Sequence, residues 1–494
     1  MLKESTEELR LMILEVFNDV LSLSSPPPGT WSRSRLLVLL KKGDPTIRGN
    51  YRPICILPLM YKLFSRMLCE RLSVFIMPLQ AVDQAAYRKG YSTDDHSFVI
   101  TQLIEKSNEY NFPLWMVLID YTKAFDSVEH SKLWEVLRDQ NVPHGYIRVL
   151  HNLYFQQTAY AKTDVCSEPF FINRGVRQGD PLSSLLFIAV MEHIFTRLKA
   201  TWRKSNRRRT RSEIGIRLSA DGKTLTNLRF ADDCVLIAQS KADAMKMLQL
   251  FIATSAEYGL SVHPGKTKFL TWDSASGGCT SVVISGQRFE VVSEHTPEKY
   301  LGRKLQFYNC HQTEFKHRVA AGWARFRTSK QELTGKDYNI GCRLRLFQAA
   351  ITTTVLYGAC TWALTKKMSD ELDITRRKML RYVLRIFRKK DESWVDYLHR
   401  AARGIERCDK AHGLQSWTDT YRLRKWRFAG QLARHHDSRW SSLVCIWAPS
   451  TYRRHVGRPT TRWEDDIVRY AGGGWASLAQ DKDAWTAHCA GFLA

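Results

Sequence analysis

The segment Leu228–Ile237, which reads LRFADDCVLI, decides the fold that this chain predicts. Apolar residues of strand character flank two adjacent acids, Asp232 and Asp233, and this pattern predicts a buried β-hairpin with both carboxylates at its tip. Carboxylates seldom lie among such apolar neighbours without a cation that neutralises them. An adjacent Asp pair also occurs in many solvated turns, so the pair alone does not identify a catalytic site.

A third acid follows an apolar run upstream. Residues 114–120 read LWMVLID, which predicts a buried strand that ends at Asp120, and YTKAFD follows at 121–126. A strand-end acid that converges with the hairpin-tip pair makes an oxygen-rich site for two Mg²⁺ ions. Such a site suits in-line phosphoryl transfer, in which one ion lowers the pKa of the attacking hydroxyl and the other stabilises the leaving pyrophosphate oxygen.

A glycine-containing segment, GVRQGDPLSS at residues 175–184, lies between the two acidic segments. Asp180 is placed to cap a helix whose first residue is Pro181. Apolar residues from Leu182 to Ala189 recur at helical spacing. The pattern predicts a helix that buries one face, preceded by a loop that approaches a ligand.

In this order, the three segments resemble motifs A, B and C of a reverse transcriptase palm, most closely that of non-LTR (LINE-type, RTE-like) retrotransposons and more distantly that of group II intron maturases. Further segments resemble the fingers, the next block, motif D and motif E of that family: KKGDP at 41–45, NYRPI at 50–54, DQAAYRKG at 83–90, GLSV through KTK at 259–268, and YLG at 300–302. The resemblance covers about residues 31–305. It implies an α+β right-hand polymerase with fingers, a palm with an antiparallel sheet, and a helical thumb.

The resemblance also implies roles for individual residues. Asp120, Asp232 and Asp233 are the expected metal ligands and catalytic acids. Lys266 is the expected proton donor to the leaving pyrophosphate, and the expected nucleotide-binding residues are Lys42, Arg52, Phe125 and Gln178.

Some of these residues have a specific expected task. Arg52 would grip the triphosphate, because a guanidinium binds phosphate oxygens bidentately. Phe125 would exclude a ribose 2′-hydroxyl and so favour deoxynucleotides, and Gln178 would touch the incoming nucleotide or the template. Each role has a plainer alternative: a core aromatic for Phe125, a backbone cap for Gln178, and a solvated charge for Lys266. The neighbouring Lys41, or surface charge alone, explains Lys42 equally well.

The implied activity is that of an RNA-directed DNA polymerase, a nucleotidyltransferase that extends a DNA primer on an RNA template with dNTPs and two Mg²⁺ ions, for which Mn²⁺ can substitute. The alternative is a non-catalytic RNA-binding or maturase-like scaffold that uses the same basic groove. Primer extension separates the two. Complete elements of this type usually carry an endonuclease domain upstream, which the first 30 residues could not hold. A truncated gene copy, a fragment of a longer protein and a domesticated polymerase that depends on another nickase therefore all stay open.

Composition favours a polyanionic partner, because 74 Lys and Arg against 49 Asp and Glu give a formal net charge of +25. A basic cluster from Arg203 to Arg211 predicts a charged loop, a nucleic-acid contact or a nuclear localisation signal. Eleven cysteines without a Cys-x-x-Cys pair indicate a reducing compartment and argue against a zinc ribbon or knuckle. Without an apolar run near 18 residues or a secretory leader, we expect no membrane partner, and a cytoplasmic ribonucleoprotein that enters the nucleus.

We expect four regions along the chain: an N-terminal helix at 7–23 with a Pro-rich linker (1–30), fingers and palm (31–305), a helical thumb (306–400) and a basic, Trp-rich C-terminal region (401–494). The thumb would contain helices at 315–332 and 342–364. Its basic residues would follow a template–primer duplex or form a solvated face: Lys316, Arg318, Arg325, Arg327 and Lys330.

The C-terminal region combines tryptophans with arginines, and GRPTTRWEDD at 457–466 resembles the tail of some RTE-like elements. Its aromatic rings could stack on unpaired bases. Regularly spaced Trp in helices more often forms a small core, which is the favoured interpretation. The tryptophans concerned are Trp417, Trp426, Trp440, Trp447, Trp463, Trp475 and Trp485.

Overall fold

The computed structural model describes residues 5–493 except 42, 48–49, 164, 205–213, 220–221, 272–277, 436–438, 450 and 455–460. Three predicted features therefore lie wholly or partly outside the described residues. They are Lys42, most of the basic cluster that begins at Arg203, and the first four residues of the GRPTTRWEDD segment.

A six-stranded sheet forms the centre of the molecule, in the order β11-β12-β10-β3-β9-β8. Its strands pair antiparallel except for β10 and β12, which are parallel. Their bounds are β3 Trp115–Ile119, β8 Asn227–Phe230, β9 Asp233–Ala238, β10 Lys268–Thr271, β11 Ser281–Ile284 and β12 Gln287–Val292. A minor pair, β6 Ile216–Arg217 and β7 Thr224–Leu225, lies outside this sheet.

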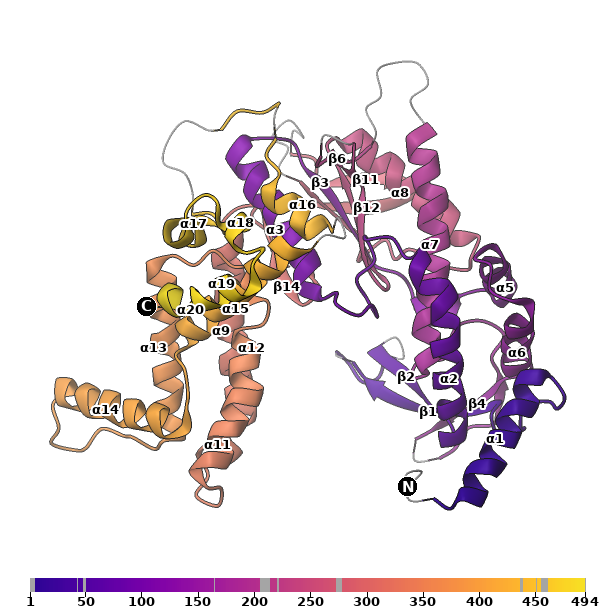
Figure 1. The fold of residues 1–494 in the computed structure, drawn as a ribbon, viewed down its shortest axis with the longest axis horizontal. Coiled ribbons are helices and arrows are strands. Elements are labelled where there is room, and N and C mark those ends of the chain that lie inside the picture. The colour runs from indigo at the N-terminus through magenta and orange to yellow at the C-terminus, as the bar shows by residue number, and fades with distance from the viewer. Residues whose placement is uncertain are drawn as a thin grey trace.

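Both faces of the central sheet are buried, which explains why its inner strands are apolar at successive positions. In β3, Trp115, Val117 and Ile119 belong to one hydrophobic cluster, whereas Met116 and Leu118 belong to another on the opposite face. The first face is covered by long helices that include α7 (Pro181–Lys204) and α8 (Lys241–Ala256), and α3 (Thr93–Tyr110) contributes to the second (Figure 1).

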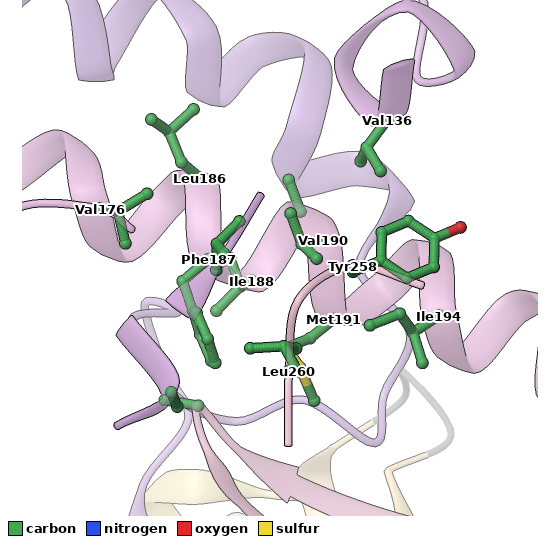
Figure 2. Close-up of a cluster of buried hydrophobic side chains, with 14 of the residues drawn as sticks. Val136, Val176, Leu186, Phe187, Ile188, Val190, Met191, Ile194, Tyr258 and Leu260 are labelled. Atoms are coloured by element: carbon green, nitrogen blue, oxygen red, sulfur yellow. The ribbon is translucent and has the colours of Figure 1, made fainter. Parts of the chain in front are cut away.

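Helix α7 contributes Leu186, Phe187, Val190 and Met191 to the first cluster, and Met191 lies beside Leu260 (Figure 2). Contrary to the sequence expectation, this helix is long and apolar enough to cross a membrane by length and composition, with a mean hydropathy of 1.3 in an 18-residue window within Pro181–Arg203. However, 72% of that window is buried inside the protein. The apolar surface of α7 is therefore used for packing within the protein core.

The fingers contain a four-stranded sheet in the order β2-β1-β4-β5, built from β1 Arg33–Leu40, β2 Tyr51–Ile56, β4 Thr158–Lys162 and β5 Phe170–Phe171. Strand β1 pairs antiparallel with β2 and parallel with β4. Neighbouring helices are α1 Glu7–Ser22, α2 Leu59–Ile76 followed by the 3₁₀ turn Met77–Leu79, α4 Ala124–Ser127, α5 His130–Asp139 and α6 His144–Tyr154. In Figure 1 the fingers sheet and the thumb helices both lie below the central sheet, the fingers to the right and the thumb to the left.

The predicted N-terminal helix is confirmed as α1, but its apolar face is only partly used. Phe17 and Val20 are buried, and the Phe17 ring lies 5.2 Å from that of Phe64 in α2. Leu9 and Met12 are exposed at 47% and 63%. Helical periodicity therefore identified the helix but overstated the width of its buried face.

The thumb follows a short hairpin of β13 Glu298–Tyr300 and β14 Arg303–Leu305. Its elements are α9 Cys310–Thr328, α10 Lys330–Thr334, α11 Ile340–Leu346, a π-helical segment Phe347–Thr352, α12 Thr353–Val355, a 3₁₀ turn Ala359–Thr361, α13 Lys366–Val383 and α14 Trp394–His412. The helix expected to reach Leu364 ends at Val355, because Gly358 takes a left-handed conformation (φ 65°) and Trp362 is extended.

One predicted nucleic-acid contact in the thumb is wrong. Arg318 is buried, its Nε donates to Glu314 Oε1 at 2.6 Å, and its guanidinium lies over the Tyr357 ring. This arginine therefore stabilises the base of α9. The other four basic residues named for this surface are exposed.

The C-terminal helices pack on the palm. They are α15 Trp417–Arg434, α16 Trp440–Ile446, α17 Asp465–Ala471, α18 Trp475–Leu478, α19 Lys482–Ala487 and α20 Cys489–Leu493. The expected boundary at residue 401 lies inside α14. The Trp463 ring contacts that of Phe98 in α3 at 4.7 Å, and its indole donates to the Cys360 carbonyl at 2.7 Å.

Six of the seven C-terminal tryptophans are at most 8% exposed, and Trp447 is half-buried. The favoured core interpretation is confirmed for the buried six, whose rings are not available for base stacking. Five of these six tryptophans belong to the cluster that covers the second face of the palm sheet, and Trp417 packs in the thumb. The buried tryptophans therefore share the cores of the palm and the thumb.

Candidate active site

The three acids lie at neighbouring positions on the palm sheet. In the antiparallel pairing of β3 with β9, Ile119 is opposite Cys234, so Asp120 follows β3 where Asp233 begins β9. Strand β8 pairs Phe230 with Asp233, which puts Asp232 in the two-residue turn of the hairpin. The convergence expected from the sequence is therefore present in the fold.

The turn that carries the acid pair has a left-handed residue, Ala231, with φ 57°. Its backbone N–H donates to Gln84 Oε1 at 3.2 Å, and the same oxygen accepts a hydrogen bond from the Ala86 N–H at 2.9 Å. Gln84 is fully buried. A residue other than glycine is strained in this conformation, so the buried amide helps to hold the turn.

The acid pair carries an electrostatic cost. Both residues are exposed, yet surrounding protein partly desolvates their carboxylates. This desolvation, followed by repulsion from Asp232 and Asp120, raises the pKa of Asp233 to about 6, although Lys41 and Lys299 oppose the shift. Desolvation and Asp120 likewise raise the pKa of Asp232, whereas Arg52 and Lys41 lower it.

Asp120 is fixed through its backbone and remains accessible through its side chain. The His263 N–H donates to the Asp120 carbonyl at 2.8 Å, and the Asp120 N–H donates to Thr267 Oγ1 at 3.2 Å. The Lys266 Nζ lies 3.6 Å from Asp120 Oδ1, with both side chains about half exposed. The structure thus brings Lys266 to the candidate site.

The chemistry of these donors fits Mg²⁺. Within the described residues, no three His, Cys, Asp or Glu side chains converge tightly enough to form a metal cage by themselves. Mg²⁺ rarely uses such a cage, because it is usually held by one or two carboxylates together with water and substrate phosphate oxygens. Adjacent, exposed carboxylates that repel each other meet that requirement.

The glycine-containing loop packs against protein backbone. A Cβ added at Gly175 would lie 2.6 Å from the Asp126 carbonyl oxygen, and one at Gly179 would lie 2.9 Å from the Cys55 carbonyl oxygen. The close neighbours of these two glycines are the segment after β3 and a fingers strand, and the approach of the loop to a ligand stays a prediction. The loop then ends at Asp180, which accepts a hydrogen bond from the Leu182 N–H at 3.1 Å and caps α7 as predicted.

Gln178 links the loop before α7 to the segment after β3 and to strand β2. Its Nε2 donates to Asp126 Oδ1 at 3.0 Å, and its carbonyl accepts a hydrogen bond from the Cys55 N–H at 2.9 Å. Gln178 therefore ties the fingers strand β2 to the segment that follows Asp120.

Phe125 was interpreted either as a core aromatic or as a residue that meets the nucleotide sugar, and its surroundings have features of both. Its ring stacks on Phe187 of α7, with centroids 4.4 Å apart and planes 15° apart, yet the residue is only half-buried. Its carbonyl accepts the Val176 N–H at 2.7 Å. The packing fixes the ring, and the exposed part leaves a surface that a nucleotide could meet.

Two cations from the fingers act on the acid pair. Arg52 lies on β2 opposite Leu39, is exposed, and lowers the pKa of Asp232. Lys41 follows β1 and lowers the pKa of both acids. Lys42 lies outside the described residues, so the role expected for a lysine of this motif stays a prediction.

A buried ionic network behind the hairpin was not assigned from the sequence. Arg229, three residues before Asp232, is fully buried, and its Nη2 lies 2.7 Å from Glu192 Oε2 and 3.6 Å from Asp83 Oδ2. Lys199 also pairs with Asp83, and the Trp440 indole donates to Asp83 Oδ1 at 2.6 Å. The only sequence signal for this network was the presence of charged residues in two motifs, Asp83 in the 83–90 block and Arg229 near the Asp pair.

The sequence of the chain is similar to those of known proteins. The family described as reverse transcriptase (RNA-dependent DNA polymerase) matches residues 39–305, more than half of the chain. A transposon-derived protein of Caenorhabditis elegans is 32% identical over 288 residues, which cover 55% of this chain and 97% of that protein. A polyprotein of the R2 retrotransposable element of Popillia japonica is 27% identical over 266 residues, which cover 51% of this chain and 34% of the polyprotein.

Among solved structures, the chain is similar to apo telomerase from Candida tropicalis, with 11% identity, coverage of 89% of this chain and 68% of that chain, and a TM-score of 0.42. The chain thus spans nearly all of the worm relative but about a third of the R2 polyprotein.

Proposed function

Because this chain belongs to the reverse transcriptase family of non-LTR retrotransposons, we propose that it extends a DNA primer on an RNA template with dNTPs by two-metal phosphoryl transfer. The observation that carries this proposal is the adjacency of Asp120, at the end of β3, to the Asp232–Asp233 turn. Desolvation and the neighbouring carboxylates raise the pKa of Asp232 and of Asp233, and a divalent cation bound between the acids would relieve this repulsion.

In this proposal, Asp120, Asp232 and Asp233 hold Mg²⁺, with Mn²⁺ as a substitute. When bound, the two ions would activate the primer 3′-hydroxyl and neutralise the charge that develops on the leaving pyrophosphate. The remaining steps are carried by side chains of the chain itself.

The surrounding side chains would bind and orient the nucleotide. Arg52 and Lys41 would contact the triphosphate, a role that is supported by the effect of both charges on Asp232. Phe125 would meet the sugar, and Gln178 would hold the loop beneath it through Asp126. Lys266, beside Asp120, would donate a proton to the pyrophosphate.

Primer extension by Asp232→Asn tests the proposal. The substitution removes a metal-binding charge but keeps the side-chain shape, and we expect extension with Mg²⁺ to fall by about 10³-fold, the equivalent of several kcal/mol of lost charge stabilisation. Thermal stability should be retained or increased, because repulsion within the pair is relieved.

The matched control is Asp370→Asn, a surface aspartate whose side chain is 53% exposed and which pairs with Lys366 on the thumb. It should leave extension unchanged. Equal extension by wild type and Asp232→Asn would refute the metal-ligand assignment. A wild-type protein that binds RNA but extends no primer would favour the alternative function of an RNA-binding scaffold.

A further inference from the structure

The tip of the thumb presents exposed aromatic rings among basic side chains. Tyr382 near the end of α13, Phe387 in the loop that follows, and Trp394 at the start of α14 are 45%, 56% and 57% exposed. The segment 381–394 also holds five basic residues and two acidic ones, Asp391 and Glu392. The basic residues are Arg381, Arg385, Arg388, Lys389 and Lys390.

Each exposed ring has an aromatic neighbour, and Tyr382 reaches a ring of the thumb core. The Tyr382 ring lies 6.2 Å from that of buried Phe326 in α9, and 6.4 Å from the Phe387 ring. Trp394, the first residue of α14, lies 5.4 Å from buried Tyr397. Each exposed ring is therefore held near a defined position by a neighbouring aromatic side chain.

Hydrogen bonds hold the loop between the two helices. Arg400 makes a bidentate pair with Glu392, with both N–O distances 2.7 Å, and also donates to the Phe387 carbonyl at 2.7 Å. The Tyr397 hydroxyl donates to the Ile386 carbonyl at 3.2 Å. The loop is thus shaped before any ligand arrives.

The same contacts make the tip electropositive. Because Arg400 hydrogen-bonds its carboxylate, the pKa of Glu392 falls to about 2, so the acid stays ionised and paired with that arginine. Glu392 is paired with Arg400 from outside the segment, so the five basic residues outweigh the acids of the segment, Asp391 and Glu392. An anchored set of rings in such a field has the composition of a single-stranded nucleic-acid platform, because bases stack on aromatic faces and phosphates pair with cations.

We propose that this tip, defined as residues 381–394, binds unpaired RNA. The inference deepens the proposed function, on which it rests for the identity of the nucleic acid, by giving the unpaired part of the template a place to bind. A duplex hides its base faces, so stacking on Phe387 and Tyr382 requires unpaired bases.

Binding is tested on the full chain without dNTPs or divalent ions, by fluorescence anisotropy of an oligouridylate and of an RNA–DNA heteroduplex of equal length. Phe387→Ser should weaken oligouridylate binding by about tenfold, the loss of one stacked base, and leave heteroduplex binding unchanged. The control Phe155→Ser removes a ring of equal exposure (58%) from the end of α6, which lies far from α14, and should change neither (Figure 1).

The charge arm uses Arg385→Gln, Lys389→Gln and Lys390→Gln together. Three lost phosphate contacts should flatten the slope of log affinity against log salt for the oligouridylate by about 2. The control triple Arg66→Gln, Lys366→Gln and Lys410→Gln removes the same charge from side chains that are 64%, 89% and 79% exposed elsewhere. It should leave the slope near that of wild type.

Three results would overturn the inference. Unchanged oligouridylate binding by both tip variants would show that RNA binds elsewhere, and equal losses for oligouridylate and heteroduplex would make the tip a general duplex contact. A change in sedimentation of Phe387→Ser, with RNA affinity intact, would identify a protein contact instead. RNA binding is also measured in Asp232→Asn. If the wild-type chain extends no primer but still binds oligouridylate through residues 381–394, the proposed function fails and this inference stands.

Discussion

At the scale of single residues, the acid pair combines exposure with mutual repulsion. Asp233 has a pKa of about 6 in the folded chain, against a usual value near 3.8. Folding therefore stabilises the protonated form of Asp233 relative to the ionised form. Its contribution to folding stability is therefore full below about pH 4 and is lost as the pH rises through 6. Near neutral pH, the repulsion between these acids lowers the folding stability of the metal-free chain and strengthens the binding of a cation.

This gives a pH-dependent prediction for Asp233→Asn. Without divalent ions, the variant should be more stable than wild type at pH 7.5 by up to about 1 kcal/mol, a figure reduced for the solvent exposure of the side chain. At pH 4 the two proteins should unfold alike, because Asp233 is then neutral in the folded chain. Denaturant unfolding at both pH values measures the difference.

Mg²⁺ provides the internal control for this experiment. Saturating Mg²⁺ at pH 7.5 should stabilise wild type more than Asp233→Asn and so narrow the gap between them. A gap that is equal at pH 4 and 7.5, or insensitive to Mg²⁺, would remove Asp233 from the ion-binding set.

Phe125 provides a second prediction, because stacking on Phe187 and discrimination of the sugar are separable. Phe125→Val should raise ribonucleotide incorporation relative to dNTPs by about tenfold or more, since the side chain that would meet the 2′-hydroxyl is shortened. Single-nucleotide extension with matched rNTP and dNTP measures the ratio.

The control is Phe187→Leu, which removes the stacking partner but leaves the Phe125 ring in place. Both substitutions should lower stability, by about 1 to 3 kcal/mol. If both also leave sugar selectivity unchanged, Phe125 is a core aromatic only.

The sequence was informative about residues wherever a local pattern determined their position. An apolar run that ends in Asp120 and a hairpin that carries Asp232–Asp233 fix where those acids lie, because antiparallel pairing brings a strand end to a neighbouring turn. The Phe125–Phe187 stack and the contact of Trp440 with Asp83 depend on segments distant in sequence. Local patterns do not carry that information, so these contacts could not be predicted.

At the scale of elements, the loop before α7 links three parts of the site through close backbone contacts. Gly175 has φ 89° and lies against the Asp126 backbone, and its N–H donates to the Val128 carbonyl at 2.8 Å. The next residue, Val176, donates to the Phe125 carbonyl. Any shift of this loop therefore moves the segment that carries Phe125.

Gly175→Ala should lower the free energy of unfolding by about 3 kcal/mol, from left-handed strain and a clash with backbone together, and should raise the KM for dNTP. Gly413→Ala separates the two causes, because Gly413 is also left-handed (φ 61°) but has no atoms within 4 Å of an added Cβ. It should cost only about 1 kcal/mol. Equal costs for the two variants would mean that the loop adjusts freely.

Elements were predicted best where caps and periodicity agreed. Helix α7 starts at Pro181 after the Asp180 cap, as the sequence indicated. The helix predicted to reach Leu364 ends early because Gly358 and the following 3₁₀ turn bend the chain toward the palm, a tertiary requirement that apolar spacing does not reveal. The apolar spacing of α1 likewise did not reveal that part of its apolar side is exposed.

At the scale of the whole molecule, the C-terminal helices complete the palm. The expected C-terminal region has no core of its own, because Trp426, Trp463 and Trp485 pack in the cluster that covers the palm sheet on the α3 side. The sequence correctly favoured burial of these tryptophans but could not show that their partners are residues such as Phe98, more than 300 positions earlier. Removal of this region should therefore expose apolar palm surface and promote aggregation.

The link from the C-terminal region to the acid pair passes through one buried hydrogen bond. Burial alone would raise the pKa of Asp83, but Lys199 and Arg229 outweigh it and lower that pKa, so the acid is ionised and accepts the Trp440 indole N–H. Arg229 in turn exchanges backbone hydrogen bonds with the 83–85 segment, at 2.8 and 3.0 Å, three residues before Asp232.

Trp440→Phe keeps a ring but removes the donor to an ionised acceptor, and should lower the free energy of unfolding by about 2 kcal/mol. The loss should appear locally as faster amide hydrogen exchange in residues 227–238, because the network that braces β8 is weakened. Trp362→Phe is the matched control: its indole is buried without a hydrogen-bond partner among the described residues, so it loses ring volume alone, in the thumb core. If both variants lose equal stability and exchange at 227–238 stays at the wild-type rate, the C-terminal region covers the palm without bracing the hairpin that carries Asp232 and Asp233.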